Sequence, residues 1–300
     1  MTGLPQYGLG TWKIPKEKAA DLVYQSILYG IRAFDCACDY GNEEEVGKGI
    51  QRAIHEGVCT RQELTITSKL WNTYHAKDHV EMAIRKSLFD LQLDYLDLYL
   101  IHFPICLKYV PMDVRYPPEW IYDPTSFPPK IEVCPVPISE TWEAMESLVD
   151  LGLTRHIGLS NFNVQSISDI LSYSRISPAV LQIELHPYLQ QQPLVDFCHS
   201  KGIQVTAYSP LGASSYIEIN LDKRQGEGVL NEVSLLLSIH AMIEHEGYYH
   251  SHSSFPWQRN IIVPPHKLSY DGILKETSGS FRRVRRLSES SRISEYLILN

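Results

Sequence analysis

Short runs of apolar and β-branched residues alternate along the chain with longer segments whose apolar positions recur at helical spacing. Such alternation predicts successive βα units around a parallel sheet. Residues 138–151 are one helical segment, and residues 77–92 are another, with a single apolar face formed by Val80, Ala83, Ile84, Leu88 and Leu91. The predicted strands are 31–35, 64–69, 96–102, 156–160, 180–184, 203–208 and 260–264.

This order of elements favours a closed (β/α)8 TIM barrel over an open doubly wound sheet, which would normally show a glycine-rich dinucleotide turn. Gly8 and Gly10 lack a third glycine at the required offset, and Gly41 with Gly47 and Gly49 does not have the spacing of a phosphate loop. We interpret these glycines as turn and helix-packing residues. The barrel is expected over residues 1–265, with its pattern degraded after about 220, and residues 266–300 are expected to form a divergent, basic C-terminal tail.

Charge and cysteine content narrow the partners of the chain. The balance of 27 Lys and Arg against 35 Asp and Glu gives a net charge of −8, which disfavours nucleic acid. The six cysteines form no CxxC pair, so they predict neither a disulfide framework nor a zinc site. No apolar run predicts a signal peptide or a membrane span, and we expect a cytoplasmic protein. The sequence is compatible with a homodimer but does not determine the oligomeric state.

One connection is too long for routine joining of a strand to a helix. Residues 103–137 form a stretch rich in Pro and Tyr, FPICLKYVPMDVRYPPEWIYDPTSFPPKIEVCPVP. Loops of this length in compact domains are usually lids or binding loops. We therefore expect this segment to border a functional site.

Polar residues stand where predicted strands end, which is where barrel enzymes place their reacting groups. Asp35, Lys69 and His102 end three successive strands, and Tyr40 follows Asp35 by five residues. Each alone has an ordinary structural explanation as a loop cap, a snorkelling cation, a core histidine or a packed aromatic. Together, a Lys–Asp pair is expected to lower the pKa of Tyr40 so that it acts as a general acid, while His102 donates a hydrogen bond to the same substrate oxygen.

In the contexts FDCACDYGNEEEVG, TITSKLWN and LYLIHFP, these four residues resemble the catalytic tetrad of the aldo-keto reductases. Their intervals of 5, 29 and 33 residues match the spacing of that family. The motifs GLGTW, IGLSNF, LQIELHPYLQQ and TAYSPLG extend the resemblance over about residues 3–220. The resemblance implies a reductase built on a (β/α)8 barrel.

The same resemblance implies binding of NADP(H) or NAD(H) without a Rossmann fold. The residues that it assigns to the nicotinamide half of the cofactor are Ser160, Asn161, Gln182 and Tyr208. Those that it assigns to the pyrophosphate and the adenosine ribose are Ser209, Leu211, Ser214 and Glu218. Those at the mouth of the site are Thr11, Trp12 and Lys13. Amide side chains and a planar aromatic at strand ends suit a flat ring that bears a carboxamide.

Within the family, the long segment after His102 and the acid directly before Tyr40 are most similar to the D-xylose reductases. The resemblance then implies an aldose substrate, with reduction of D-xylose to xylitol as the expected reaction. The residues that it places around the sugar are Trp12, Asp39, His102 and Phe103. A carboxylate beside an aromatic wall suits an open-chain polyol.

The resemblance weakens in the last third of the chain. Where the family has an I-P-K-S phosphate-binding motif, residues 264–267 read PPHK, and His266 and Lys267 are expected to meet the adenosine phosphate. Gly272 stands where an arginine is expected, and Glu276 stands where an asparagine is expected. Because a bidentate arginine adds geometry to charge, these changes predict weak discrimination between NADPH and NADH.

Two alternatives to an aldose reductase stay open. One is a reductase of other aldehydes or keto sugars, and the other is a non-catalytic binding or regulatory protein, suggested by the altered adenosine-phosphate motif. The histidines in the altered region are expected to lie in a polar loop and to bind no metal; they are His245, His250 and His252.

Overall fold

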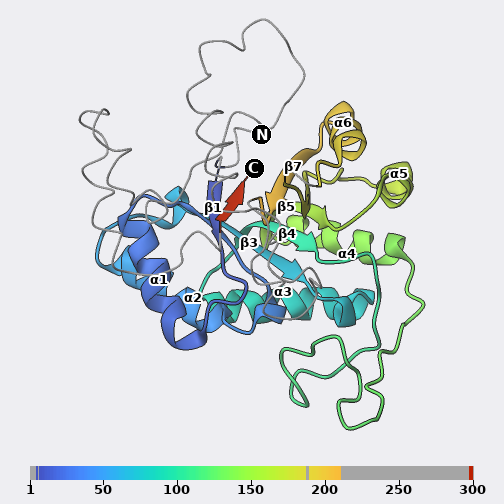
Figure 1. Cartoon of the computed structure of the whole chain (residues 1–300), viewed down its shortest axis with the longest axis horizontal. Coiled ribbons are helices and arrows are strands. Elements are labelled where there is room, and N and C mark those ends of the chain that lie inside the picture. Colours follow the sequence, from blue (N-terminus) through green and yellow to red (C-terminus); the bar gives the residue numbers. More distant parts are fainter. Residues whose placement is uncertain (1–4, 6, 187–188, 211–296, 300) are drawn as a thin grey trace, which may run out of the picture.

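The computed structural model describes residues 5, 7–186, 189–210 and 297–299, and it places eight strands in a closed barrel (Figure 1). The first seven strands pair in parallel with their neighbours, and the eighth runs antiparallel to β1 and β7. In barrel order, the strands are β1 (Tyr7–Gly10), β2 (Ala33–Asp35), β3 (Thr65–Leu70), β4 (Leu96–Ile101), β5 (Thr154–Ser160), β6 (Val180–Glu184), β7 (Gln204–Tyr208) and β8 (Leu297–Leu299). The predicted barrel class is therefore confirmed.

Helices cover the outside of the barrel between successive parallel strands, as expected for βα units. They are α1 (Lys16–Leu28), α2 (Glu43–His55), α3 (Lys77–Leu91), α4 (Ile138–Asp150), α5 (Val164–Tyr173) and α6 (Gln192–Ser200). The apolar face predicted for residues 77–92 is buried along α3. At the start of α5, the Asn163 side chain accepts a hydrogen bond from Ser166 N at 2.9 Å, which caps the helix.

The sequence pattern located six of the parallel strands to within about two residues, and it missed the short β1. The predicted strand 260–264 lies outside the described residues. In the described part of the chain, the place between β7 and β1 is taken by β8, with Ala207 opposite Leu299 and Leu9 opposite Leu297. This strand comes from the range expected as a divergent tail.

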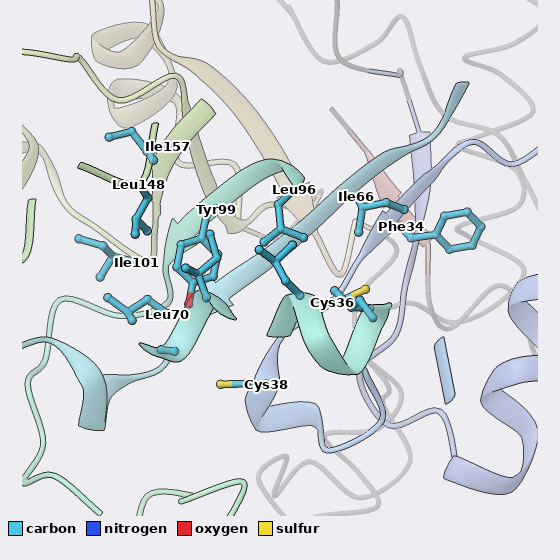
Figure 2. Close-up of a cluster of buried hydrophobic side chains, with 14 of the residues drawn as sticks. Phe34, Cys36, Cys38, Ile66, Leu70, Leu96, Tyr99, Ile101, Leu148 and Ile157 are labelled. Carbon is cyan, nitrogen blue, oxygen red and sulfur yellow. The ribbon is translucent and has the colours of Figure 1, made fainter. Parts of the chain in front are cut away.

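The core lies between the strands and the helices that cover them. Figure 2 shows side chains of β2, β3, β4 and β5 packed in one cluster that includes Leu148 of α4. Glycines permit close approach of the covering helices. A Cβ on Gly47 of α2 would lie 2.6 Å from Asp90 O in α3, and one on Gly49 would lie 2.5 Å from Ala20 O in α1. The interpretation of these glycines as helix-packing residues is confirmed.

The long connection between β4 and α4 leaves the barrel and returns (Figure 1). Its two arms are joined by antiparallel bridges between Leu107 and Val133 and between Asp123 and Lys130. Among the described residues, this connection is the largest departure from a regular βα repeat.

In the part of the chain that the structure describes, no helix is both long and apolar enough to cross a bilayer.

Candidate active site

A buried lysine stands at the centre of the candidate site. Lys69 Nζ donates hydrogen bonds to Asp35 Oδ2 at 2.6 Å, to Tyr40 Oη at 2.9 Å and to the Cys36 carbonyl at 3.0 Å. The side chain is 0% exposed, so its charge is compensated by these three partners rather than by water. Three of the four residues predicted as a tetrad therefore form one hydrogen-bonded group.

The barrel register explains why these residues meet. Asp35 ends β2 and pairs with Thr67 of β3, and Thr67 precedes Lys69 by two residues. A backbone hydrogen bond from Cys36 N to Thr67 O extends this pairing. The segment from Cys38 to Tyr40 forms a 3₁₀ turn that ends at Gly41, whose φ of 69° favours glycine. This turn brings Tyr40 back over the end of β3.

His102 completes the group from the end of the next strand. Its backbone N–H bonds to Leu70 O at 3.1 Å, and its ring lies 5.8 Å from the Tyr40 ring in an edge-to-face arrangement. The ring of Phe103 stacks on it at 4.8 Å, and the Trp71 ring lies 5.2 Å away. The structure thus brings all four predicted catalytic residues to one place at the carboxyl ends of β2, β3 and β4.

The environment of the tetrad keeps two of its members neutral. Burial and the carboxylates of Asp35 and Asp39 raise the pKa of Tyr40 well above its ordinary value of 10. Burial and the Lys69 cation lower the pKa of His102 well below its ordinary 6.5. The pKa of Tyr40 is therefore raised overall in this state and not lowered as expected, because burial is the largest effect on it. A neutral phenol and a neutral imidazole are both able to donate a hydrogen bond.

Four residues assigned by resemblance to the nicotinamide lie beside the tetrad and are ordered by it. Gln182 Nε2 donates to Asp35 Oδ1 at 2.8 Å. Asn161 Nδ2 donates to the His102 carbonyl at 2.9 Å and to Ser160 Oγ at 3.1 Å, and Tyr208 Oη donates to Asn161 Oδ1 at 2.8 Å. Amides and a partly exposed aromatic ring are thereby held at the carboxyl ends of β5, β6 and β7. This donor set fits a carboxamide-bearing ring.

The remaining cofactor assignments divide between the mouth of the barrel and the undescribed part of the chain. Thr11 Oγ1 donates to the Asp35 carbonyl at 3.0 Å, and Lys13 Nζ lies 4.5 Å from the centre of the Trp12 ring, which is 41% exposed. Ser209 directly follows β7. The other assigned residues lie outside the described residues; they are Leu211, Ser214, Glu218, His266 and Lys267.

An aromatic wall that the sequence did not fully reveal stands beside His102. Trp71 follows β3 directly, and its Nε1 donates to the Glu119 carbonyl at 3.2 Å. The Trp120 ring lies 5.0 Å from Trp71 and 5.1 Å from Phe103. The long β4–α4 loop thus borders the site, as its length predicted. The signal in the sequence for the contribution of Trp71 was its position two residues after Lys69.

Asp39 lies in the turn before Tyr40 with an unsatisfied carboxylate oxygen. Its Oδ1 is buried and has no hydrogen-bond partner among the described residues. Burial and the nearby Glu119 raise the pKa of Asp39 from 3.8 to about 7. The carboxyl group is therefore half protonated near neutral pH, unlike an ordinary surface aspartate.

This shift gives a stability prediction for Asp39. Between about pH 4 and 7 the folded chain binds more protons at Asp39 than the unfolded chain, so the free energy of unfolding falls as pH rises, by at most about 1.4 kcal/mol per pH unit. Urea unfolding across this range should show a shallower fall for Asp39→Asn than for the wild type. Asp113→Asn, an exposed acid on the long loop, is the control and should keep the wild-type slope. Equal slopes for Asp39→Asn and the wild type would contradict the shift.

The fold and the tetrad define a class of protein, and comparison with known proteins agrees with it. A sequence model of the aldo/keto reductase family matches residues 1–242. The chain therefore belongs to the aldo/keto reductase family, as the four residues and their spacing implied.

Its similarity to particular members is substantial. An NAD(P)H-dependent D-xylose reductase of Pyricularia oryzae is 52% identical over 219 residues, which cover 73% of this chain and 67% of that protein. A probable NAD(P)H-dependent D-xylose reductase of Emericella nidulans is 47% identical over 264 residues, covering 87% of this chain and 81% of that protein.

Solved structures agree in fold over a similar part of the chain. The aldose reductase of Schistosoma japonicum matches with a TM-score of 0.65 and 40% identity, over 73% of this chain and 71% of that chain. The aldose reductase of Giardia lamblia matches with a TM-score of 0.64 and 39% identity, over 69% of this chain and 66% of that chain. The chain thus spans about two thirds of the length of several relatives that it matches.

Proposed function

We propose that the chain reduces the aldehyde of an open-chain aldose, with NADPH or NADH as the hydride donor, and that D-xylose is converted to xylitol. The observation that carries the proposal is the buried Lys69 that holds Asp35 and Tyr40 together at the carboxyl end of the barrel. The family, and the similarity to NAD(P)H-dependent D-xylose reductases, support an NAD(P)H-dependent oxidoreductase.

The amides of Asn161 and Gln182 and the ring of Tyr208 would hold the dihydronicotinamide, which would supply a hydride to the carbonyl carbon of the substrate. As that carbon is reduced, its oxygen becomes strongly basic, and Tyr40 gives it the phenolic proton. A raised pKa in the resting state does not prevent this step, because the alkoxide is a far stronger base than the phenolate. Lys69 then stabilises the phenolate directly through the bond from Nζ to Tyr40 Oη at 2.9 Å.

The other two members of the tetrad position groups and share charge. Asp35 accepts from both Lys69 and Gln182, so it fixes the cation under Tyr40 and holds the Gln182 amide. His102, kept neutral, donates from its ring to the carbonyl oxygen and lowers the cost of the negative charge that develops there. Water is limited at this point by the rings of Trp71 and Phe103.

Asp39 and the aromatic wall suit a polyhydroxylated substrate. The unpartnered Asp39 Oδ1 accepts hydrogen bonds from sugar hydroxyl groups, which satisfy an oxygen that is otherwise buried without a donor. Trp12 and Phe103 offer apolar surface to the carbon chain. An aldose satisfies both features, whereas a simple alkyl aldehyde leaves Asp39 unsatisfied.

Cofactor titration tests the proposal at its first requirement. Titration with NADPH and with NADH should quench the protein fluorescence and show saturable binding of at least one cofactor to the full chain. When D-xylose is then added to the complex, it should be reduced. If the chain binds a cofactor but reduces only other aldehydes or keto sugars, the assignment of an aldose as substrate is wrong. Failure of both cofactors to bind would favour the non-catalytic binding protein.

The same titration measures cofactor discrimination. Because Gly272 stands where an arginine would meet the 2′-phosphate, we expect the NADPH/NADH ratio of kcat/KM to be below about tenfold, or about 1.4 kcal/mol. Gly272→Arg should raise this ratio in favour of NADPH. A wild-type ratio above about a thousandfold would show that other basic groups reach the phosphate.

A further inference from the structure

Two cysteines face each other at the base of the long β4–α4 loop. The antiparallel bridge between Leu107 and Val133 is flanked by a bond from Cys134 N to Cys106 O at 2.9 Å. On its other side, Lys108 N bonds to Glu132 O at 2.8 Å. This register places Cys106 directly opposite Cys134.

The pairing gives the two cysteines the spacing that a disulfide requires. Residues opposite each other at a hydrogen-bonded position of an antiparallel pair have Cα atoms about 5.5 Å apart, which is a common Cα separation across disulfides. Opposite residues of such a pair project their side chains from the same face of the ribbon, and the Cys134 thiol is near enough to contribute to the raised pKa of Cys106. A bond between the two sulfurs therefore needs little movement of the backbone.

Exposure separates this pair from the other thiols. Cys106 and Cys134 are partly exposed, whereas Cys36, Cys38, Cys59 and Cys198 are buried. Cys36 and Cys38 are two residues apart on one strand end and its turn, and both belong to the buried surroundings of Tyr40. Among the described cysteines, the pair on the loop is the one that both lies opposite a partner cysteine and is open to a reagent.

We propose that Cys106 and Cys134 form a reversible, oxidant-driven disulfide that closes the base of the β4–α4 loop. The oxidant is a low-molecular-weight disulfide. The Cys134 thiolate attacks one sulfur of the small disulfide and releases the other as a thiolate. Cys106 then attacks the Cys134 sulfur of the mixed disulfide and releases the second small thiol. The two protein thiols lose two electrons and two protons, and the small disulfide gains them.

The environment of Cys106 fixes the order of the two attacks. Burial and the adjacent Cys134 raise the pKa of Cys106 to about 12. Since the thiolate is the attacking species, Cys106 is the slower nucleophile and Cys134 is modified first. Ring closure, the step that uses Cys106, is expected to speed up as pH rises.

The disulfide would enclose the part of the loop that contributes to the aromatic wall. Glu119, whose carbonyl accepts from Trp71, and Trp120, which packs against Trp71 and Phe103, both lie between the two cysteines in the chain. Closing the ring adds a covalent link between the two arms of the loop that carries these residues. Oxidation is therefore expected to affect one side of the candidate site. Formation of the disulfide does not depend on the proposed reductase activity.

The test uses the full chain, oxidised glutathione and thiol mapping. The native protein is incubated with oxidised glutathione, remaining thiols are alkylated after denaturation, and non-reduced peptides are analysed by mass spectrometry. We expect four of the six cysteines to be alkylated, and one cross-linked peptide pair that joins Cys106 to Cys134. Addition of a reducing thiol should restore all six.

Single variants separate the two steps. Cys106→Ser should trap a mixed disulfide with glutathione at Cys134, whereas Cys134→Ser should remain largely unmodified at Cys106. Cys198→Ser, a buried position on α6, is the control and should still form the cross-link. Separate alkylation of Cys106 and Cys134 in oxidised wild-type protein, or a cross-link between other cysteines, would overturn the proposal.

Limited proteolysis gives a second readout on the folded protein. Trypsin has exposed sites within the ring at Lys108 and Lys130. If the disulfide forms, fragments cut within the ring stay joined on a non-reducing gel and separate after reduction. Fragments that separate without reductant after treatment with oxidised glutathione would contradict the bond.

Discussion

Tyr40→Phe lowers the rate of aldehyde reduction by about 10²–10⁴-fold and leaves the dissociation constants of NADPH and NADH nearly unchanged. The expected loss is large because the Tyr40 hydroxyl is the group that bonds to Lys69 Nζ and is able to deliver a proton to the substrate oxygen. Phenylalanine retains the ring that packs edge-to-face against His102, so the shape of the site is kept. Steady-state kinetics with D-xylose and fluorescence titration of each cofactor measure the two effects separately.

Tyr173→Phe is the matched control for this variant. Tyr173 lies at the end of α5, outside the tetrad, where its hydroxyl donates to Asp169 Oδ2 at 3.2 Å. Removal of that hydroxyl should leave both kcat and cofactor affinity at wild-type values. If Tyr40→Phe still reduced xylose at nearly the wild-type rate, Tyr40 would not be the proton donor.

Local sequence pattern predicted those features of the fold that depend on neighbouring residues. The apolar face of α3 and the strand ends near Asp35 and Lys69 follow from the pattern within a single element, and the structure agrees to within one residue. The closing strand β8 was not predicted, because its three residues pair with β1 and β7 far away in the chain. A run of three apolar residues carries no local signal that tells a strand from the end of a tail.

In the candidate site, the sequence predicted which residues come together but not how deeply they are buried. Residue spacing predicted that Asp35, Tyr40, Lys69 and His102 meet, because parallel strand ends share one edge of a barrel. Spacing does not report burial, and burial reverses the predicted direction of the Tyr40 pKa. Similarly, the length of the β4–α4 loop predicted a role at the site, but contact between Trp120 and Trp71 depends on the path of that loop.

Lys69→Met should destabilise the fold strongly, because it leaves the Asp35 carboxylate in the barrel without its cation. Removing one partner of a buried ion pair typically costs about 3–5 kcal/mol, chiefly through the unpaired charge that remains. Lys69 is fully buried and Asp35 nearly so, which places this pair in that class. Urea unfolding at neutral pH measures the loss. The exposed pair of Lys48 and Glu44 supplies the contrast, and Lys48→Met should leave the free energy of unfolding nearly unchanged.

A double variant distinguishes the loss of charge compensation from the loss of packing. In Asp35→Asn with Lys69→Met the unpaired charge is gone, while the amide oxygen at position 35 still accepts from Gln182 Nε2, as Asp35 Oδ1 does at 2.8 Å. The double variant should therefore regain most of the stability that Lys69→Met loses, although it lacks the group that stabilises the Tyr40 phenolate and stays inactive. A double variant no more stable than Lys69→Met would show that the loss comes from packing and from the missing bonds to Cys36 O and Tyr40 Oη, and not from an unpaired charge at Asp35.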